Sequence, residues 1–116
     1  DFISLHCPLT EETRNLINKE TLALMKKTAF LINTARGGLI DEEALQNSLQ
    51  KSELAGFAAD VISEEPMKET NPLLRCPNTL ITPHIAWASF ETRSRLMNAV
   101  EKNLASFLSG KPQNMV

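Results

Sequence analysis

The stretch FLINTARGG, residues 30–38, places a short apolar run directly before an arginine and two glycines. Three further apolar runs follow the same plan, and each leads into polar or reactive side chains: residues 2–5 into His6-Cys7-Pro8, residues 55–59 into Asp60, and residues 79–82 into Pro83-His84. Runs of this length are typical of buried strands in a parallel sheet. Ligands bind to such sheets just beyond the carboxyl ends of the strands. The sequence therefore predicts that Arg36, Asp60 and His84 belong to one site.

Amphipathic segments between these runs predict helices, so we expect an α/β fold with a parallel sheet and flanking helices. Strands are expected at residues 2–5, 29–33, 54–60 and 79–82, buried on both faces. Helices are expected at residues 19–26, 42–51 and 90–109, with N-caps at Asn18, Asp41 and Ser89. In the last helix a four-residue apolar repeat predicts one buried stripe, formed by Leu96, Val100, Leu104 and Leu108.

The composition is that of one ordinary globular domain, with 116 residues, 42% hydrophobic and 22% charged. A formal net charge of −2 gives no reason to expect a nucleic acid or an anionic membrane as partner. No apolar run approaches the roughly 20 residues that a membrane-spanning helix needs. Cys7 and Cys76 fit no zinc spacing, so we expect free thiols, no metal site and a cytoplasmic protein.

Four charged side chains could carry chemistry, although each alone also suits a structural role. Arg36 could bind a carboxylate, with the adjacent glycines letting the ligand approach, or could be a surface residue of a tight turn. Asp60 could accept a hydrogen bond from a ligand or anchor a loop. His84 could donate a proton if Glu65, from the long loop 61–78, or Asp60 orients its ring. Together they predict carbonyl reduction or proton transfer on a small carboxylate.

Three motifs, in this order along the chain, resemble the signatures of the D-isomer-specific 2-hydroxyacid dehydrogenases: NTARGGLID at 33–41, DVISEEP at 60–66 and TPHIA at 82–86. The segment LHCPLTEET, residues 5–13, resembles the part of the family that precedes them. HIAWAS, residues 84–89, is most similar to the glycerate dehydrogenase (hydroxypyruvate reductase) branch. The resemblance covers the whole chain.

This resemblance implies an oxidoreductase that transfers hydride between NAD or NADP and a small D-2-hydroxy acid or 2-keto acid, with glycerate and hydroxypyruvate as the expected pair. It implies that Arg36 binds the substrate carboxylate, and that Glu65 and His84 form a catalytic pair in which His84 donates the proton. Asp60 is implied to contact the nicotinamide carboxamide. Further cofactor contacts are implied for Cys7, Pro8, Thr13, Thr34, Ala35, Arg36, His84 and Ala86.

The glycine fingerprint G-x-G-x-x-G, which holds the pyrophosphate, does not occur in these 116 residues. The chain also begins with Asp1, inside an expected strand. We therefore expect residues 1–116 to be the C-terminal part of a Rossmann NAD(P)-binding domain, including the final helix, and to be inactive alone. A homodimer is expected through the strand at residues 1–5. One alternative stays open at this point, namely a nucleotide-sensing corepressor, which is a binding module of the same family. The choice between NAD and NADP also stays open.

Overall fold

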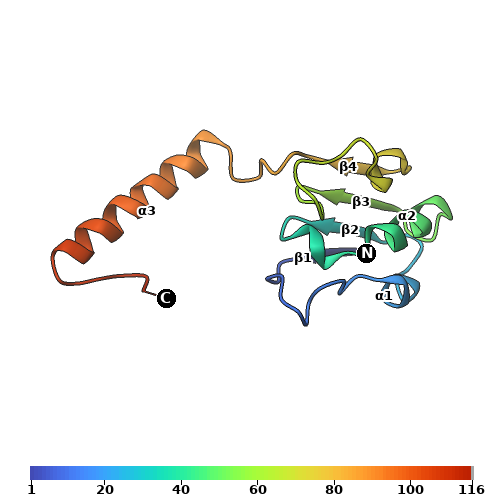
Figure 1. Ribbon diagram of the computed structural model, residues 1–116, viewed down its shortest axis with the longest axis horizontal. Coiled ribbons are helices and arrows are strands. Elements are labelled where there is room, and N and C mark those ends of the chain that lie inside the picture. The colour runs from blue at the N-terminus through green and yellow to red at the C-terminus, as the bar shows by residue number, and fades with distance from the viewer. Residues whose placement is uncertain (116) are drawn as a thin grey trace. The chain divides into compact units, whose positions relative to one another are not determined.

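The computed structural model describes residues 1–115 and contains a four-stranded parallel sheet (Figure 1). The strands follow one another across the sheet in chain order: β1 (Phe2–Leu5), β2 (Phe30–Asn33), β3 (Gly56–Ala59) and β4 (Thr79–Ile81). The register pairs Ile3 with Leu31 and Leu31 with Phe57. The predicted parallel sheet is confirmed; β1 has the expected bounds, and the other three strands are somewhat shorter than expected.

Capping hydrogen bonds start the helices where the sequence predicts them. Asn18 Oδ1 accepts the Thr21 N–H at 3.0 Å and begins α1 (Lys19–Ala23). Asp41 Oδ1 accepts the Ala44 N–H at 3.0 Å and begins α2 (Glu42–Gln50). Both predicted N-caps are therefore confirmed.

The first helix ends earlier than predicted, at Ala23 instead of Lys26. The N–H groups of Leu24 and Met25 each bond a carbonyl three residues back, which tightens the last turn and closes the helix. Two short 3₁₀ segments lie in other connections, namely η1 (Gly37–Leu39) and η2 (Pro72–Arg75). The second lies within the predicted loop 61–78, where an Asn-Pro pair begins it.

One face of the sheet packs against the core, whereas the other face is exposed. Leu31 is fully buried and Phe57 is 3% exposed, and both pack with apolar residues of α1 and α2. Phe2, Phe30 and Leu80 on the other face are 76%, 43% and 65% exposed. The prediction that the strands are buried on both faces is therefore wrong for the described residues. Right-handed crossovers between strands in chain order all lie on one side, so these connections cover only that face.

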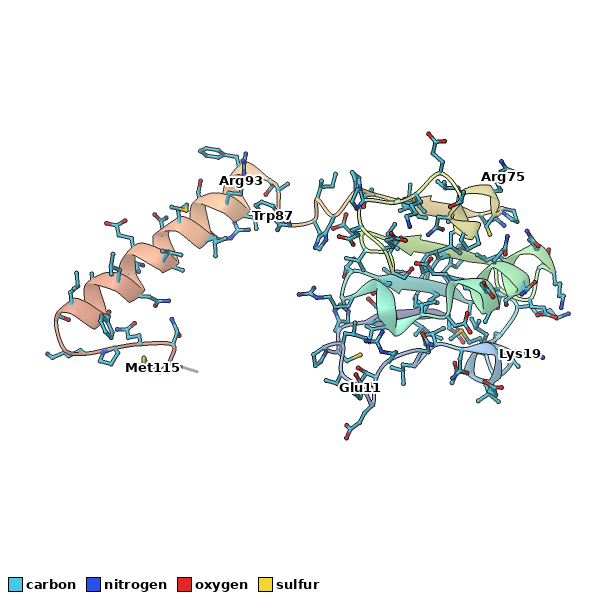
Figure 2. The ribbon with its side chains drawn as sticks, in the orientation of Figure 1. Glu11, Lys19, Arg75, Trp87, Arg93 and Met115 are labelled. Atoms are coloured by element: carbon cyan, nitrogen blue, oxygen red, sulfur yellow. The ribbon has the colours of Figure 1, made fainter. Side chains whose placement is uncertain are left out.

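The residues from Ile85 onward form a second compact unit that consists mainly of α3 (Phe90–Leu108), shown with its side chains in Figure 2. Ser89 Oγ accepts the Thr92 N–H at 3.2 Å, which confirms the predicted N-cap. The predicted buried stripe is wrong, since no residue of α3 is buried and Leu96 is 55% exposed. Among residues 85–115 of this unit, α3 is the only helix or strand, so no second element covers the stripe there. In residues 1–115, no helix combines the length and hydrophobicity needed to cross a membrane.

Candidate active site

The carboxyl ends of the strands bring most of the predicted site residues to one edge of the sheet. Because the strands are parallel, the segments that follow them all begin at this edge. These segments carry Cys7, Pro8 and Thr13 after β1, Thr34, Ala35 and Arg36 after β2, Asp60 after β3, and His84 after β4.

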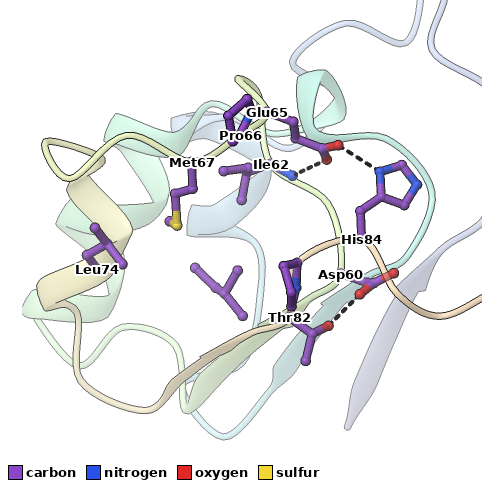
Figure 3. A pocket seen from close by; sticks show the side chains of 10 residues that line it. Asp60, Ile62, Glu65, Pro66, Met67, Leu74, Thr82 and His84 are labelled. Carbon is purple, nitrogen blue, oxygen red and sulfur yellow. Dashed lines mark hydrogen bonds and ion pairs between the residues drawn. The ribbon is translucent and has the colours of Figure 1, made fainter. Parts of the chain in front are cut away.

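His84 and Glu65 form an ion pair at this edge. His84 Nδ1 lies 2.7 Å from Glu65 Oε2, and the two side chains are 45% and 37% exposed. The His84 backbone has φ of +56°, in the left-handed region that histidine occupies more often than most residues. Its N–H donates to the Thr82 carbonyl at 3.0 Å. Figure 3 shows the imidazole turned toward Glu65, the carboxylate that the resemblance to the family implies as the partner of His84.

Both oxygens of the Glu65 carboxylate are engaged. Oε1 accepts the Ile62 N–H at 3.2 Å, while Oε2 binds the imidazole. The hydrogen bond from His84 lowers the pKa of Glu65, and it outweighs the partial desolvation that acts in the opposite direction. Glu65 is therefore ionised at neutral pH and can orient the ring through Nδ1. This leaves Nε2 as the ring nitrogen that can exchange a proton with a substrate.

Asp60 is held at the ends of β3 and β4. Its side chain is buried, with 5% exposure, and Thr82 Oγ1 donates to its Oδ1 at 2.5 Å. The Thr82 N–H also bonds the Ala59 carbonyl at 2.9 Å, which continues the strand pairing. The sequence assigned no role to Thr82. Its position could have indicated a role, because Thr82 directly follows β4 and Asp60 directly follows β3, and His84 lies two residues after Thr82.

A cavity of about 400 Å³ lies beside these groups (Figure 3). Asp60, Glu65 and His84 line one part of it. The remaining wall is mainly apolar and consists of Ile62, Pro66, Met67, Leu74, Ile81, Thr82 and Pro83. A small organic ligand fits a largely apolar cavity with a few polar groups that orient it.

Arg36 lies in the turn after β2, and the buried Asn33 side chain shapes this turn. Asn33 Nδ2 donates to the Arg36 carbonyl at 2.9 Å, and its Oδ1 accepts the Ala35 N–H at 3.0 Å. The exposed guanidinium donates from Nη1 to the Ala35 carbonyl at 2.7 Å. Within residues 1–115, no hydrogen bond or ion pair joins Arg36 to Glu65 or His84. The cation is therefore open to an anionic ligand.

The two glycines after Arg36 pack closely against other parts of the protein. A Cβ at Gly37 would lie 1.8 Å from the Ile62 carbonyl carbon. A Cβ at Gly38 would lie 2.9 Å from the Leu9 side chain. These contacts give the two glycines a packing role, whereas the approach of a ligand to them stays a prediction. They allow the turn after β2 to pack closely against the loops that follow β3 and β1.

The remaining predicted cofactor residues lie on loops. Thr13 Oγ1 donates to the Pro8 carbonyl at 2.7 Å, which closes the loop after β1. Cys7 is a partly buried free thiol, and Cys76 is also free, as predicted. Ala86 belongs to the second compact unit. In the part of the chain that the structure describes, no three His, Cys, Asp or Glu side chains gather as metal ligands.

A parallel sheet with ionisable side chains at its carboxyl edge is typical of α/β domains that bind a ligand there, nucleotide-binding domains among them. The chain belongs to the D-isomer specific 2-hydroxyacid dehydrogenases, because residues 1–86 match the NAD binding domain of that family. The resemblance found in the motifs is thus confirmed at the level of the family.

Two relatives and one solved structure show the extent of the similarity. Glycerate dehydrogenase of Methylorubrum extorquens is 48% identical over 118 residues, a match that covers 100% of this chain and 38% of that protein. Hydroxypyruvate reductase of Blautia hydrogenotrophica is 47% identical over 116 residues, covering 100% and 36%. The structure of an acyclic imino acid reductase in complex with NADPH and D-Arg has a TM-score of 0.89 at 38% identity, covering 100% and 37%. The chain spans little more than a third of the length of these relatives.

Proposed function

We propose that the protein containing this chain reduces a small 2-keto acid to a D-2-hydroxy acid with NADH or NADPH, and catalyses the reverse oxidation. The observation that carries the proposal is the His84–Glu65 pair at the carboxyl edge of the sheet, in a chain of this family. The names of the two relatives favour hydroxypyruvate and glycerate as the substrate pair.

His84 is the proposed acid. Glu65 binds Nδ1 at 2.7 Å and stabilises the protonated ring, so the Nε2 proton is available for the substrate. During reduction the carbonyl carbon gains a hydride, and the carbonyl oxygen takes the Nε2 proton to become a hydroxyl. In the reverse direction the neutral ring accepts the proton of the hydroxyl group at Nε2.

Arg36 is the proposed partner of the substrate carboxylate. A guanidinium can bind both carboxylate oxygens through two parallel hydrogen bonds, which fixes the substrate in position and orientation. The exposed Arg36 side chain follows β2 at the edge where His84 follows β4. The proposal therefore assigns binding of the carboxylate and donation of the proton to two separate loops.

Asp60 fits the nicotinamide carboxamide, because its buried carboxylate borders the cavity and can accept an amide N–H. The bound cofactor would supply the hydride. We assign Cys7, Pro8 and Thr13 to the adenosine half of the cofactor, and Thr34 and Ala35 to positions beside the nicotinamide. The family domain is named for NAD, whereas the imino acid reductase binds NADPH, so both cofactors belong in the assay.

The proposal takes residues 1–116 as the C-terminal part of the NAD(P)-binding domain of a cytoplasmic homodimer. The corepressor alternative is not favoured, because both relatives named above and the superposed structure are named as dehydrogenases or reductases.

Two substitutions in the whole protein test the proposed roles, with reduction of hydroxypyruvate, glyoxylate and pyruvate followed by NADH or NADPH absorbance. His84→Ala is expected to lower kcat by about 10²–10⁴-fold, the usual contribution of a positioned acid. Arg36→Ala is expected mainly to raise KM, by about 10- to 100-fold, because it removes a charged hydrogen bond made to the bound substrate.

The controls are His6→Ala and Arg75→Ala, which remove an exposed histidine and an exposed arginine that have no role in the proposal. Both controls are expected to keep the kcat and KM of the parent. An unchanged kcat in His84→Ala would remove this histidine from the mechanism.

A further inference from the structure

Glu42 connects the start of α2 to the loop that follows β3. Its Oε1 accepts the Ser63 N–H at 2.7 Å, and its Oε2 accepts an N–H of Asn71 Nδ2 at 2.8 Å. Glu42 is the first residue of α2 and is partly buried, whereas the next residue, Glu43, is exposed. A carboxylate on a helix that packs into the core thus binds two points of one loop.

These two points lie on either side of Glu65 in the loop. Ser63 precedes Glu65, and Asn71 follows it and accepts the Leu73 N–H at 2.9 Å at the start of η2. Between Ser63 and Asn71 only Met67 is even partly buried. Core packing therefore does little to hold this segment, and its hydrogen bonds must place Glu65.

The Ser63 contact is adjacent to the one that orients the Glu65 side chain. The Ile62 N–H donates to Glu65 Oε1 at 3.2 Å, and the next N–H along the chain donates to Glu42. Two successive peptide N–H groups are therefore bound by two carboxylates, which restricts rotation of the backbone that leads to Glu65. We propose that Glu42 is a positioning residue that holds Glu65 within hydrogen-bonding distance of His84, an inference that rests on the function proposed for that pair.

A carboxylate at position 42 can accept from both the Ser63 N–H and the Asn71 amide, because it has two acceptor oxygens. A glutamine at position 42 offers one oxygen, and its NH₂ group would face a second donor. Asn71 cannot turn its own oxygen toward that NH₂ group without releasing the Leu73 N–H. Glu42→Gln is therefore expected to lose one of the two hydrogen bonds while keeping the size of the side chain.

The test compares Glu42→Gln with Glu43→Gln in the whole protein, since the control makes the same change at the exposed neighbour. Glu42→Gln is expected to lower kcat for 2-keto acid reduction by about 10- to 100-fold, the effect of a small misplacement of a reacting group. KM is expected to stay within about twofold, because the substrate carboxylate is bound elsewhere. Glu43→Gln is expected to change neither constant.

A titration of the Glu65 carboxyl by ¹³C NMR provides a measurement that does not depend on turnover. The hydrogen bond from His84 lowers the pKa of Glu65. In Glu42→Gln, but not in Glu43→Gln, this pKa is expected to return toward the ordinary value of a glutamate. If the pKa of Glu65 in Glu42→Gln stays as low as in the parent, the inference is overturned.

The double variant Glu42→Gln/Asn71→Asp tests whether the hydrogen bonds themselves matter. The new amide at position 42 can donate to the new carboxylate at position 71, whose second oxygen still accepts the Leu73 N–H. Recovery of kcat and of the lowered Glu65 pKa would support the inference, and failure of both to recover would overturn it. If His84→Ala leaves kcat unchanged, the proposed function fails, whereas the Glu65 titration still decides the role of Glu42.

Discussion

At the scale of single residues, two hydrogen bonds and one unusual backbone angle set what the site can do. Glu65 holds Nδ1 of His84, and the Ile62 N–H holds the other Glu65 oxygen. The positive φ of His84 costs on the order of 1 kcal/mol, and residues keep such a conformation where the surrounding contacts enforce it. This strain is typical of functional sites and supports the role proposed for His84.

We expect Glu65→Gln to lower kcat for 2-keto acid reduction, although by less than His84→Ala does, because the acid itself remains. The glutamine keeps a polar partner near Nδ1 but removes the negative charge that pairs with the protonated ring. The control is Glu64→Gln, which neutralises an exposed carboxylate that pairs with Lys68 at 2.6 Å. If Glu65→Gln keeps the kcat of the parent and of Glu64→Gln, Glu65 does not support the proton donor.

The same substitution has an effect on stability whose sign follows from the lowered pKa of Glu65. A carboxyl whose pKa is lowered by folding stabilises the fold above its unfolded pKa, and this contribution is lost as pH falls through the folded value. In urea unfolding, Glu65→Gln is expected to be less stable than the parent at neutral pH and equally stable in strong acid. The difference should stay below about 1 kcal/mol, because the two side chains are 37% and 45% exposed. The same deficit at both pH values would contradict the linkage.

At the scale of elements, the site depends on contacts between loops that follow different strands. The Asn15 N–H donates to the Gly38 carbonyl at 3.0 Å, which joins the loop after β1 to η1. Gly37, at the start of η1, packs against the Ile62 backbone in the loop after β3. The loops after β1, β2 and β3, which carry proposed substrate and cofactor residues, therefore hold one another in position through these contacts.

We expect Gly37→Ala to destabilise the fold by about 1–3 kcal/mol or more, because the new methyl group overlaps backbone atoms that cannot rotate away. The matched control is Gly38→Ala, whose methyl group meets the ends of the flexible Leu9 and Arg14 side chains and should cost less. Urea unfolding with an unchanged m-value provides the comparison. An equal decrease in the free energy of unfolding in the two variants would show that the Ile62 contact does not constrain this turn.

At the scale of the whole molecule, the first compact unit presents an apolar surface next to an unpaired strand edge. Within the described residues β1 is at the edge of the sheet, and the Phe2 and Phe30 rings stack with centroids 5.6 Å apart. A cavity of about 420 Å³ lies on the same face and is lined mainly by apolar residues, Leu80 among them. Apolar edge strands are templates for pairing with another chain.

We expect the 116-residue chain to form a two-fold dimer through this surface, since a self-complementary edge closes most simply in pairs. Phe2→Lys places a charge on the edge strand and is expected to weaken the dimer while leaving the circular dichroism spectrum unchanged. Leu24→Lys is the control, because Leu24 is 86% exposed and lies outside the sheet. Sedimentation of the unsubstituted chain as a monomer at high micromolar concentration would contradict this expectation.

The sequence by itself determined the features that have local causes. The N-caps Asn18, Asp41 and Ser89 could be predicted because each capping bond joins residues three apart in the chain. The apolar runs predicted the strands. They therefore also predicted that Arg36, Asp60 and His84, which follow three of these strands, lie at the carboxyl edge of the sheet. The motifs at residues 33–41, 60–66 and 82–86 were specific enough to indicate the family.

The family motifs already implied that Glu65 pairs with His84, and the structure shows the contact. Only the tertiary structure showed that Gly37 meets Ile62 and that Glu42 binds the loop through Ser63, because neither contact has a periodic signal. The apolar repeat of α3 identified one face of the helix but did not show whether a surface covers it. Contacts between residues far apart in the chain depend on the paths of loops. Those paths are set by packing between elements, whereas sequence periodicity reports only the conformation within one element.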